Sequence, residues 1–301
     1  MKGDCENSSK DFKNYIDKYP NGYFLLNANF YYAECMYKME NLTEALIGYK
    51  YASIQSKNKF TEKSLLRAGY ISFKQNNFMD AITHYAKLEQ VAELPSNIME
   101  ARIGQMRSHF KLNQHQASIT QASKLLQTEK VSNELVYESH LTIAKSALAL
   151  KNDSLAMTEF VKTASLTKNI LGAEAKYNVA LLQFKQNKIK EAEKTIFELV
   201  DQIPSYDYWI AKSFILLAEV YFAKGDNFQA KSTLQSIIDN YEGKDLVNEA
   251  QDRLNQIIEI EKAEEQKRKQ QEMEIKFDTN NINDNELFEE DIIPNQGGNN
   301  E

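Results

Sequence analysis

The 301-residue sequence contains little proline, glycine or cysteine, with four, ten and two residues of these types. All-β sandwiches and barrels need many turn residues, so this scarcity favours long helices. Cys5 and Cys35 are too few for a disulfide framework and lack the spacing of metal ligands. No apolar run approaches the roughly 18 residues of a membrane-spanning helix, and Met1 to Lys18 lacks the apolar core of a signal peptide.

Short motifs that carry catalysis or nucleotide binding are also missing. The sequence contains no GxxxxGK[ST], GxGxxG, HExxH, GxSxG or CxxC segment. Its four histidines are scattered, and a lone helical histidine is usually a surface or packing residue. The sequence therefore predicts no catalytic residue, no cofactor site and no metal site, and it indicates a protein that is not an enzyme.

The net charge of −7 comes from 36 basic and 43 acidic residues. Asp278 to Glu301 holds seven of the acids and no lysine or arginine, so the chain up to Phe277 is neutral as a whole. Nucleic-acid binding requires a net basic footprint that displaces counterions from phosphates. The charge balance thus argues against a nucleic-acid partner.

A small residue followed twelve positions later by alanine recurs through the chain. The pairs are Ala33/Ala45, Gly69/Ala81, Ala144/Ala156, Ala180/Ala192 and Ala218/Ala230, with a weaker copy at Gln105/Ala117. The second members are separated by 36, 36, 39, 36 and 38 residues. Small residues at these positions let two antiparallel helices approach closely, and polar turns such as MEN, QNN and KGDN separate the helices. A single hairpin cannot bury its apolar face, so the units are expected to stack.

Most copies have a large apolar residue four positions after the alanine, as at Tyr49, Tyr85 and Phe160. The weaker copy departs from this rule, because Gln105 and Gln121 occupy positions where a small and an aromatic residue are expected. We therefore expect looser packing in that unit. Its neighbour Ser118 is expected to lie off the buried face.

This pattern resembles the tetratricopeptide repeat (TPR) family over roughly residues 1–241. The resemblance implies an all-α, right-handed α-solenoid of about six helix pairs. At the start of the chain, Gly3, Ser8, Phe12 and Pro20 match the second half of a unit. We therefore expect the chain to begin inside a repeat, and its truncated N-terminal end is a candidate surface for self-association.

Two further segments follow the array. Residues 242–277 are expected to form one long helix, whose first half caps the last repeat and whose charged second half projects into solvent. Residues 278–301 are rich in asparagine and acidic residues and show no packing pattern, so they are expected to be disordered. Within them, LFEEDIIP (287–294) is a candidate linear motif.

The resemblance further implies that a protein or peptide ligand binds in the concave groove, which the first helix of each pair lines. The candidate residues on this face are Tyr37, Lys63, Arg67, Tyr70, Phe73, Lys74, Arg102, Met106, Phe184 and Phe222. The alternative is that many of these aromatics belong to the core between repeats. Lys63 and Arg67 also match two of the five residues with which some relatives clamp a partner's C-terminal carboxylate.

The sequences of the repeats, for example KYPNG and KGDNFQAKSTLQSIIDNY, are similar to those of bacterial envelope arrays. These include outer-membrane assembly lipoproteins and Tol–Pal-associated coordinators. The resemblance implies a periplasmic or envelope-associated scaffold in an assembly or secretion complex. A cytoplasmic adaptor and a self-assembling structural array are the alternatives.

Overall fold

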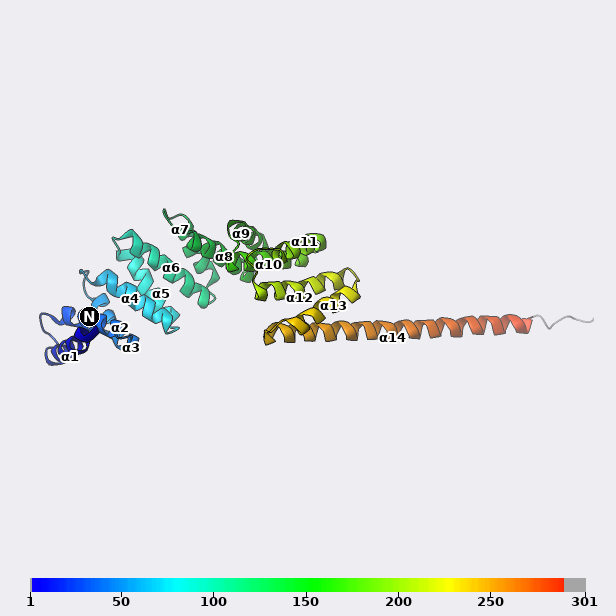
Figure 1. The fold of residues 1–301 in the computed structure, drawn as a ribbon, viewed down its shortest axis with the longest axis horizontal. Coiled ribbons are helices and arrows are strands. Elements are labelled where there is room, and N and C mark those ends of the chain that lie inside the picture. The colour runs from blue at the N-terminus through cyan, green and yellow to red at the C-terminus, as the bar shows by residue number, and fades with distance from the viewer. Residues whose placement is uncertain (1, 290–301) are drawn as a thin grey trace, which may run out of the picture. The chain divides into compact units, whose positions relative to one another are not determined.

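The computed structural model describes residues 2–289, with side chains for residues 5–275, and all regular structure within this range is α-helical (Figure 1). The helices are α1 (Lys2–Lys18), α2 (Leu25–Lys38), α3 (Leu42–Ile54), α4 (Thr61–Lys74), α5 (Phe78–Val91), α6 (Pro95–Lys111), α7 (His115–Leu126), α8 (Asn133–Ala149), α9 (Asp153–Leu166), α10 (Ile170–Lys185), α11 (Ile189–Val200), α12 (Asp207–Ala223), α13 (Asn227–Asn240) and α14 (Lys244–Glu289). The prediction of an all-α protein is confirmed.

The helices divide into two compact units, Met1–Tyr206 and Asp207–Glu301. Unit 1 contains α1 to α11, and unit 2 contains α12 to α14. The last helix pair, α12–α13, thus groups with the C-terminal helix α14. The two units also differ in their balance of basic and acidic residues. Unit 1 has 26 basic and 22 acidic residues, whereas unit 2 has 10 basic and 21 acidic residues.

Within the described range, six helix pairs from α2–α3 to α12–α13 share one type of turn. One residue in each turn has a positive φ between 57° and 79°: Glu40, Asn76, Asn113, Lys151, Asn187 and Gly225. The following N–H bonds back to the carbonyl five residues earlier, as in Asn41 to Met36, which is the Schellman geometry. Asn41, Asn77, Asn152 and Asp226 then cap the next helix through their side chains.

The turns fix which residue is the buried anchor of each second helix. Five positions after the positive-φ residue lies a fully buried small residue: Ala45, Ala81, Ser118, Ala156, Ala192 and Ala230. In the third pair this residue is Ser118, and not Ala117, which is half-buried. The Ser118 hydroxyl donates to the Met106 carbonyl at 3.0 Å. The prediction for this pair is therefore wrong by one residue, because two adjacent small residues satisfied the same pattern.

Glycines let an aromatic ring fill the space between neighbouring first helices. The ring of Tyr85 on α5 lies between Gly69 of α4 and Gly104 of α6. A Cβ atom at Gly69 would lie 2.8 Å from the Tyr85 ring, and one at Gly104 would lie closer still. Only glycine leaves room for Tyr85 at these two positions, so both residues are required by packing.

The third pair holds a polar network where looser packing was expected. The Gln121 side chain donates to Gln105 at 3.1 Å, and Gln105 donates to Glu89 at 2.8 Å. Glu89 also accepts from Arg102 at 2.9 Å and from Lys124 at 3.1 Å. Burial raises the pKa of the Glu89 carboxyl, but these hydrogen bonds outweigh burial and hold it below its usual range. The two glutamines are therefore hydrogen-bonded within the packed unit.

In unit 2, the first half of α14 completes the core of the α12–α13 pair. Leu246, Ala250, Leu254 and Ile257 are buried and belong to one cluster with Ala230 and Leu234 of α13. From Lys262 to Ile275 the helix is exposed on all sides. The predicted capping and projecting parts of this helix are therefore confirmed.

The C-terminal helix is longer than predicted and continues to Glu289. It includes residues 278–289, which the sequence analysis assigned to a disordered tail. No proline or glycine interrupts this stretch before Pro294, so no residue there stops an established helix. Residues 290–301, with most of the LFEEDIIP segment, lie outside the described residues.

Candidate functional site

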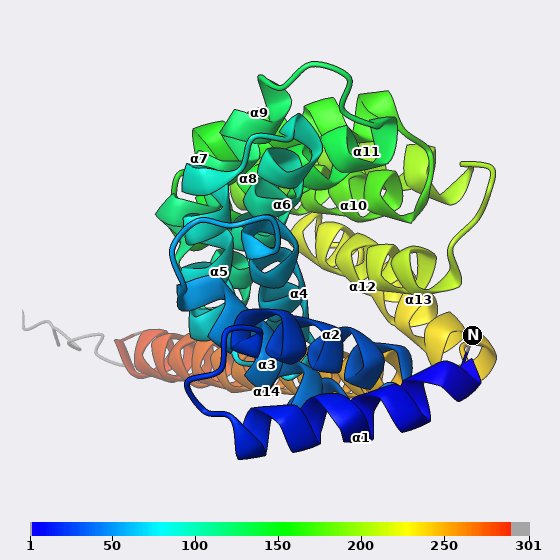
Figure 2. The ribbon, with the colours of Figure 1, turned by 90° about the vertical axis from the view of Figure 1, so that its left-hand side faces the viewer.

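The first helices of unit 1 form the inner layer of the stack. Neighbouring first helices touch each other, as α4 touches α6 and α8 touches α10. In Figure 2, α4 and α10 lie on the inner side of the arc that unit 1 describes, and α5 and α11 lie on its outer side. The first helices therefore present the inner face of unit 1.

Four first helices converge on a hollow of about 310 Å³, here called the inner hollow. Its lining residues are Phe73 of α4, Arg107, Phe110 and Lys111 of α6, Glu138, Leu141, Thr142 and Lys145 of α8, and Leu171 and Glu174 of α10. Two aromatic and two leucine side chains supply its apolar surface, and charged side chains surround them. This volume lies at the lower end of the range for ligand pockets and suits one or two bulky side chains.

Ion pairs connect successive first helices along the inner face. Arg107 donates two hydrogen bonds to Glu138, at 2.6 and 2.7 Å, and Lys145 donates to Glu174 at 2.6 Å. The hydrogen bond to Glu138 raises the pKa of the Arg107 guanidinium above its usual value. Pairs this exposed contribute about 0–1 kcal/mol each, so they orient the side chains more than they hold the helices. Their charges cancel, which leaves the hollow close to neutral.

Several predicted site residues meet between α2 and α4. The Arg67 guanidinium donates to the Tyr37 hydroxyl at 2.8 Å and lies 4.2 Å from the centre of its ring. The Tyr37 and Tyr70 rings are 6.3 Å apart, and the Lys74 ammonium lies 5.7 Å from the Tyr70 ring. These four residues form a cationic and aromatic cluster on the inner face.

Lys63 pairs instead with Glu34 of α2, at 2.6 Å. The same Glu34 carboxylate accepts a hydrogen bond from the buried Tyr49 hydroxyl at 2.6 Å. Lys63 and Arg67 are therefore engaged separately and do not present a joint site for a C-terminal carboxylate.

Residues 208–243, which contain most of α12 and all of α13, match the family model of the tetratricopeptide repeat. The chain contains a tetratricopeptide repeat. Among curated protein sequences, none matches it.

Solved TPR structures share its fold. The C-terminal part of a TPR repeat-containing protein from Cytophaga hutchinsonii is 15% identical, with a TM-score of 0.58 over 81% of this chain and 96% of that one. A signal transduction ATPase with a TPR sensor, from Pyrococcus horikoshii, is 13% identical, with a TM-score of 0.58 over 85% of this chain and 43% of its own length. YrrB is 18% identical, with a TM-score of 0.50 over 68% of this chain and 97% of that one. At these identities the likeness establishes the fold alone.

The phase of the third TPR unit changes two of the predicted site residues. Met106 is fully buried in the core and does not line the groove. Arg102 turns away from the inner face, because it donates to Glu89 of α5 at 2.9 Å and to Thr128 beyond α7 at 3.1 Å. The inner-face residues of this helix are instead Arg107, one position after Met106, and Phe110, one turn further on. The sequence contained a sign of this shift, because Ala117 and Ala156 are separated by 39 residues, more than any other pair of successive anchors. With Ser118 as the anchor, the separations between successive anchors become the more even series 36, 37, 38, 36 and 38.

The remaining predicted aromatics have different positions. Phe73 lines the inner hollow. Phe184 is half-buried on α10, outside the lining of the hollow. Phe222 belongs to unit 2, where the Arg253 guanidinium lies 5.1 Å from its ring. The inner hollow therefore uses one of the three.

Neither a cluster of metal ligands nor a membrane-spanning helix occurs among the residues that the structure describes. Over those residues, no three His, Cys, Asp or Glu side chains come together in a group that could hold a metal ion. None of the described helices combines the length and apolar character needed to cross a membrane.

Proposed function

We propose that this protein binds a segment of a partner protein on the inner face of unit 1, with the inner hollow as its anchor site. The TPR fold itself indicates a protein-interaction scaffold without catalysis. The observation that carries the finer proposal is the convergence of α4, α6, α8 and α10 on one apolar hollow. A bulky apolar side chain of the partner would bury itself against Phe73 and Phe110, as buried anchors do at interfaces.

The electrostatics of the hollow support an apolar anchor over a charged one. Arg107 and Lys145 each have a carboxylate partner, and Lys111 is the one basic lining residue for which no partner occurs among the described residues. Binding is therefore expected to depend weakly on salt. YrrB, which has the same fold, is described as a TPR protein with an unusual peptide-binding site.

A photo-crosslinking amino acid tests this site directly. Thr142 lines the inner hollow on α8, and Thr158 is an exposed threonine on the outer helix α9. Replacing each with benzoylphenylalanine in the full chain, in its native cell, gives a matched pair. We expect a discrete covalent adduct at position 142 and none at 158. Equal labelling at both positions, or labelling at 158 alone, would move the site elsewhere.

Once the adduct identifies a partner, its dissociation constant measures the anchor. Tyr70→Ala with Phe73→Ala should weaken binding by more than about 1 kcal/mol, because truncated aromatic anchors usually do so. Charge reversal at Lys63 and Arg67 should mainly slow association. An unchanged dissociation constant in the aromatic double variant, with its helix content intact, would contradict the proposal.

For the biological context, we propose a bacterial envelope assembly or secretion complex, with a cytoplasmic adaptor as the alternative. The envelope context is supported by the similarity of the repeat sequences to those of envelope arrays. Protease treatment of spheroplasts from the source cells, followed by an antibody against this chain, separates the two. Digestion without cell lysis supports the envelope, whereas protection until lysis supports the cytoplasm.

Self-assembly is a second candidate function, favoured by the aromatic side chains at the α1–α2 turn. Tyr19, Tyr23 and Phe24 are 47%, 92% and 58% exposed, and the Tyr23 and Phe24 rings are 5.0 Å apart. Exposed aromatic clusters of this kind often mark contact surfaces. Sedimentation velocity should then show concentration-dependent association that Tyr23→Ser with Phe24→Ser removes. A monomer at all concentrations would eliminate this candidate.

A further inference from the structure

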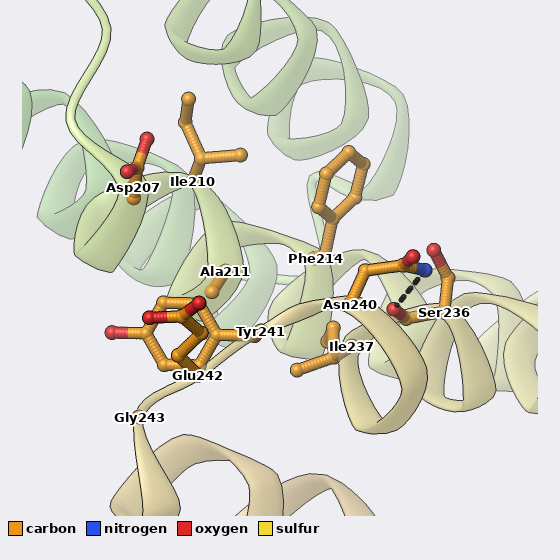
Figure 3. A pocket seen from close by; sticks show the side chains of 10 residues that line it. All are labelled: Asp207, Ile210, Ala211, Phe214, Ser236, Ile237, Asn240, Tyr241, Glu242 and Gly243. Carbon is orange, nitrogen blue, oxygen red and sulfur yellow. Dashed lines mark hydrogen bonds between the residues drawn. The ribbon is translucent and has the colours of Figure 1, made fainter.

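A larger pocket lies in unit 2, apart from the site proposed for unit 1. It has a volume of about 660 Å³ and opens between the first half of α12, the last turn of α13 and the connection to α14 (Figure 3). We call it the end pocket. Its lining residues are Asp207, Ile210, Ala211, Phe214, Ser236, Ile237, Asn240, Tyr241, Glu242 and Gly243.

Four apolar side chains from both helices and the following connection line the end pocket and are here called its floor. Ile210 and Phe214 come from α12, Ile237 comes from α13, and Tyr241 follows it (Figure 3). Phe214 and Tyr241 pack at the edge of the core that α14 completes, so they are held in place. Ile210 lies outside that core cluster. The floor can therefore receive a bulky apolar group without rearrangement of the core.

The surroundings of this floor carry negative charge. Asp207 and Glu242 line the pocket, and Asp245 lies close enough to act on Tyr241. The pKa of the Tyr241 hydroxyl is raised, first by burial and then by the charges of Asp245 and Asp207. Over the described residues, no ion pair involves any of these three carboxylates. A cation entering the pocket would meet the exposed carboxylates of Asp207 and Glu242, beside the exposed Lys244 at the start of α14.

The helix that ends at the pocket adds to this field. The C-terminus of a helix has a partial negative charge, which basic side chains in the last turn usually offset. The last turn of α13 contains no basic residue. The nearby Lys212 ammonium is turned to Tyr208, whose hydroxyl accepts from it at 3.3 Å. No basic side chain in the last turn of α13 therefore offsets the negative end of this helix.

We propose that the end pocket binds a peptide segment in which a bulky apolar side chain is flanked by lysine or arginine. The apolar side chain occupies the floor formed by Ile210 and Phe214, and the flanking cations face Asp207 and Glu242. Up to residue 277, unit 2 has 14 acidic against 10 basic residues, and this excess attracts such a segment from a distance. An anionic ligand meets repulsion at the same rim.

The test uses the full chain and a defined probe. The probe is a fluorescein-labelled heptapeptide of alternating lysine and leucine, with both ends capped, and its binding is measured by fluorescence anisotropy. We expect saturable binding that weakens as salt rises. A peptide with glutamate in place of each lysine, and one with serine in place of each leucine, should both fail to bind.

Variants locate the binding site. Asp207→Asn with Glu242→Gln should weaken binding about fivefold or more and reduce its salt dependence. Ile210→Ser should weaken binding but keep the salt dependence. The matched control is Glu264→Gln with Glu274→Gln, which removes the same two charges from an exposed stretch of α14. That stretch begins about 30 Å along the helix from residue 244, at 1.5 Å per residue.

Three results would overturn the proposal. The glutamate peptide could bind as well as the lysine peptide, or the pocket variant could bind like its matched control. The third is that Phe110→Ser in the inner hollow abolishes binding while the pocket variants leave it unchanged. In that case the peptide lies in unit 1, and the function proposed for unit 1 stands without the end pocket.

Discussion

Unit 1 and unit 2 use the same hairpin but close its core differently. In unit 1 each pair from α4–α5 to α8–α9 packs between neighbouring pairs. In unit 2 the α12–α13 pair has α14 against it, and Leu246, Leu254 and Ile257 fill its groove. An interior repeat is thus stabilised by further repeats, whereas within unit 2 the α12–α13 pair is covered by one face of α14. The two units also differ in net charge, at +4 and −11.

The only tryptophan of the chain allows the units to be followed separately. Trp209 lies in α12, so its fluorescence reports the unfolding of unit 2. Far-ultraviolet circular dichroism is weighted toward unit 1, which contains α1 to α11.

The largest effect is expected from truncating the side chain that closes the core of unit 2. Ile257→Ala removes a fully buried side chain of α14 and should cost about 2–5 kcal/mol. The tryptophan transition should move to lower urea, and the main dichroism transition should stay in place. Ile275→Ala, on the exposed part of the same helix, is the control. Parallel shifts of both signals would show that the two units unfold as one.

The second effect tests the phase within unit 1. Ser118→Leu inserts a large side chain at a fully buried position and should cost about 1–3 kcal/mol through overpacking. Ala117→Leu, one residue earlier and half-buried, should change the free energy of unfolding much less. Ala192→Leu should resemble Ser118→Leu. If the dichroism melt shows that Ala117→Leu destabilises the protein more than Ser118→Leu, then Ala117 is the buried anchor, as the sequence predicted.

The third effect is acid sensitivity, which should be greater in unit 1. Burial lowers the pKa of His84, and hydrogen bonds lower the pKa of Glu89 and Glu159 despite their burial. A group whose pKa is lower in the folded state stabilises the fold above its unfolded pKa, and this stability is lost as the pH falls. Unit 1 should therefore lose stability below about pH 6.5 through His84 and further below about pH 4.5 through the glutamates.

The partners of these groups sharpen the test. The charges of Lys50 and Lys87 lower the pKa of His84 further and that of Asp80 raises it, while Glu159 accepts from His140 at 2.5 Å and from Lys162 at 2.9 Å. His84→Gln should remove the loss of stability between about pH 6.5 and 5, and it should leave the further loss below about pH 4.5 unchanged. If lowering the pH moves the tryptophan and dichroism transitions by equal amounts, unit 1 is not more sensitive to acid than unit 2.

The smallest effect is expected at the end of the chain. Deleting residues 278–301 should leave both melting temperatures within about a degree, because the preceding stretch of α14 from Lys262 to Ile275 is already exposed. A drop of several degrees in the tryptophan transition alone would show that the segment contacts unit 2.

Much of the architecture could be predicted because it repeats. The spacing of small residues placed Ala45, Ala81, Ala156, Ala192 and Ala230 in fully buried positions, and the polar turns placed the hairpins. Where a unit offered two adjacent small residues, the pattern had two solutions that differ by one residue. One residue turns a helix face by about 100°, so Met106 was assigned to the groove and Arg107 and Phe110 were missed.

The sequence by itself determined the helix pairs, their number and the helix that covers the last of them, because these follow from periodicity, turn residues and apolar content along the chain. The tertiary structure decided which charges are free. Lys63, Arg102 and Arg107 look alike in sequence, yet each is engaged by a different carboxylate, Glu34, Glu89 or Glu138. Those partners lie 13 to 31 residues away in sequence and meet only because stacked helices bring them within hydrogen-bond distance. The inner hollow arises in the same way, from side chains of four helices that are distant in sequence and adjacent in the fold.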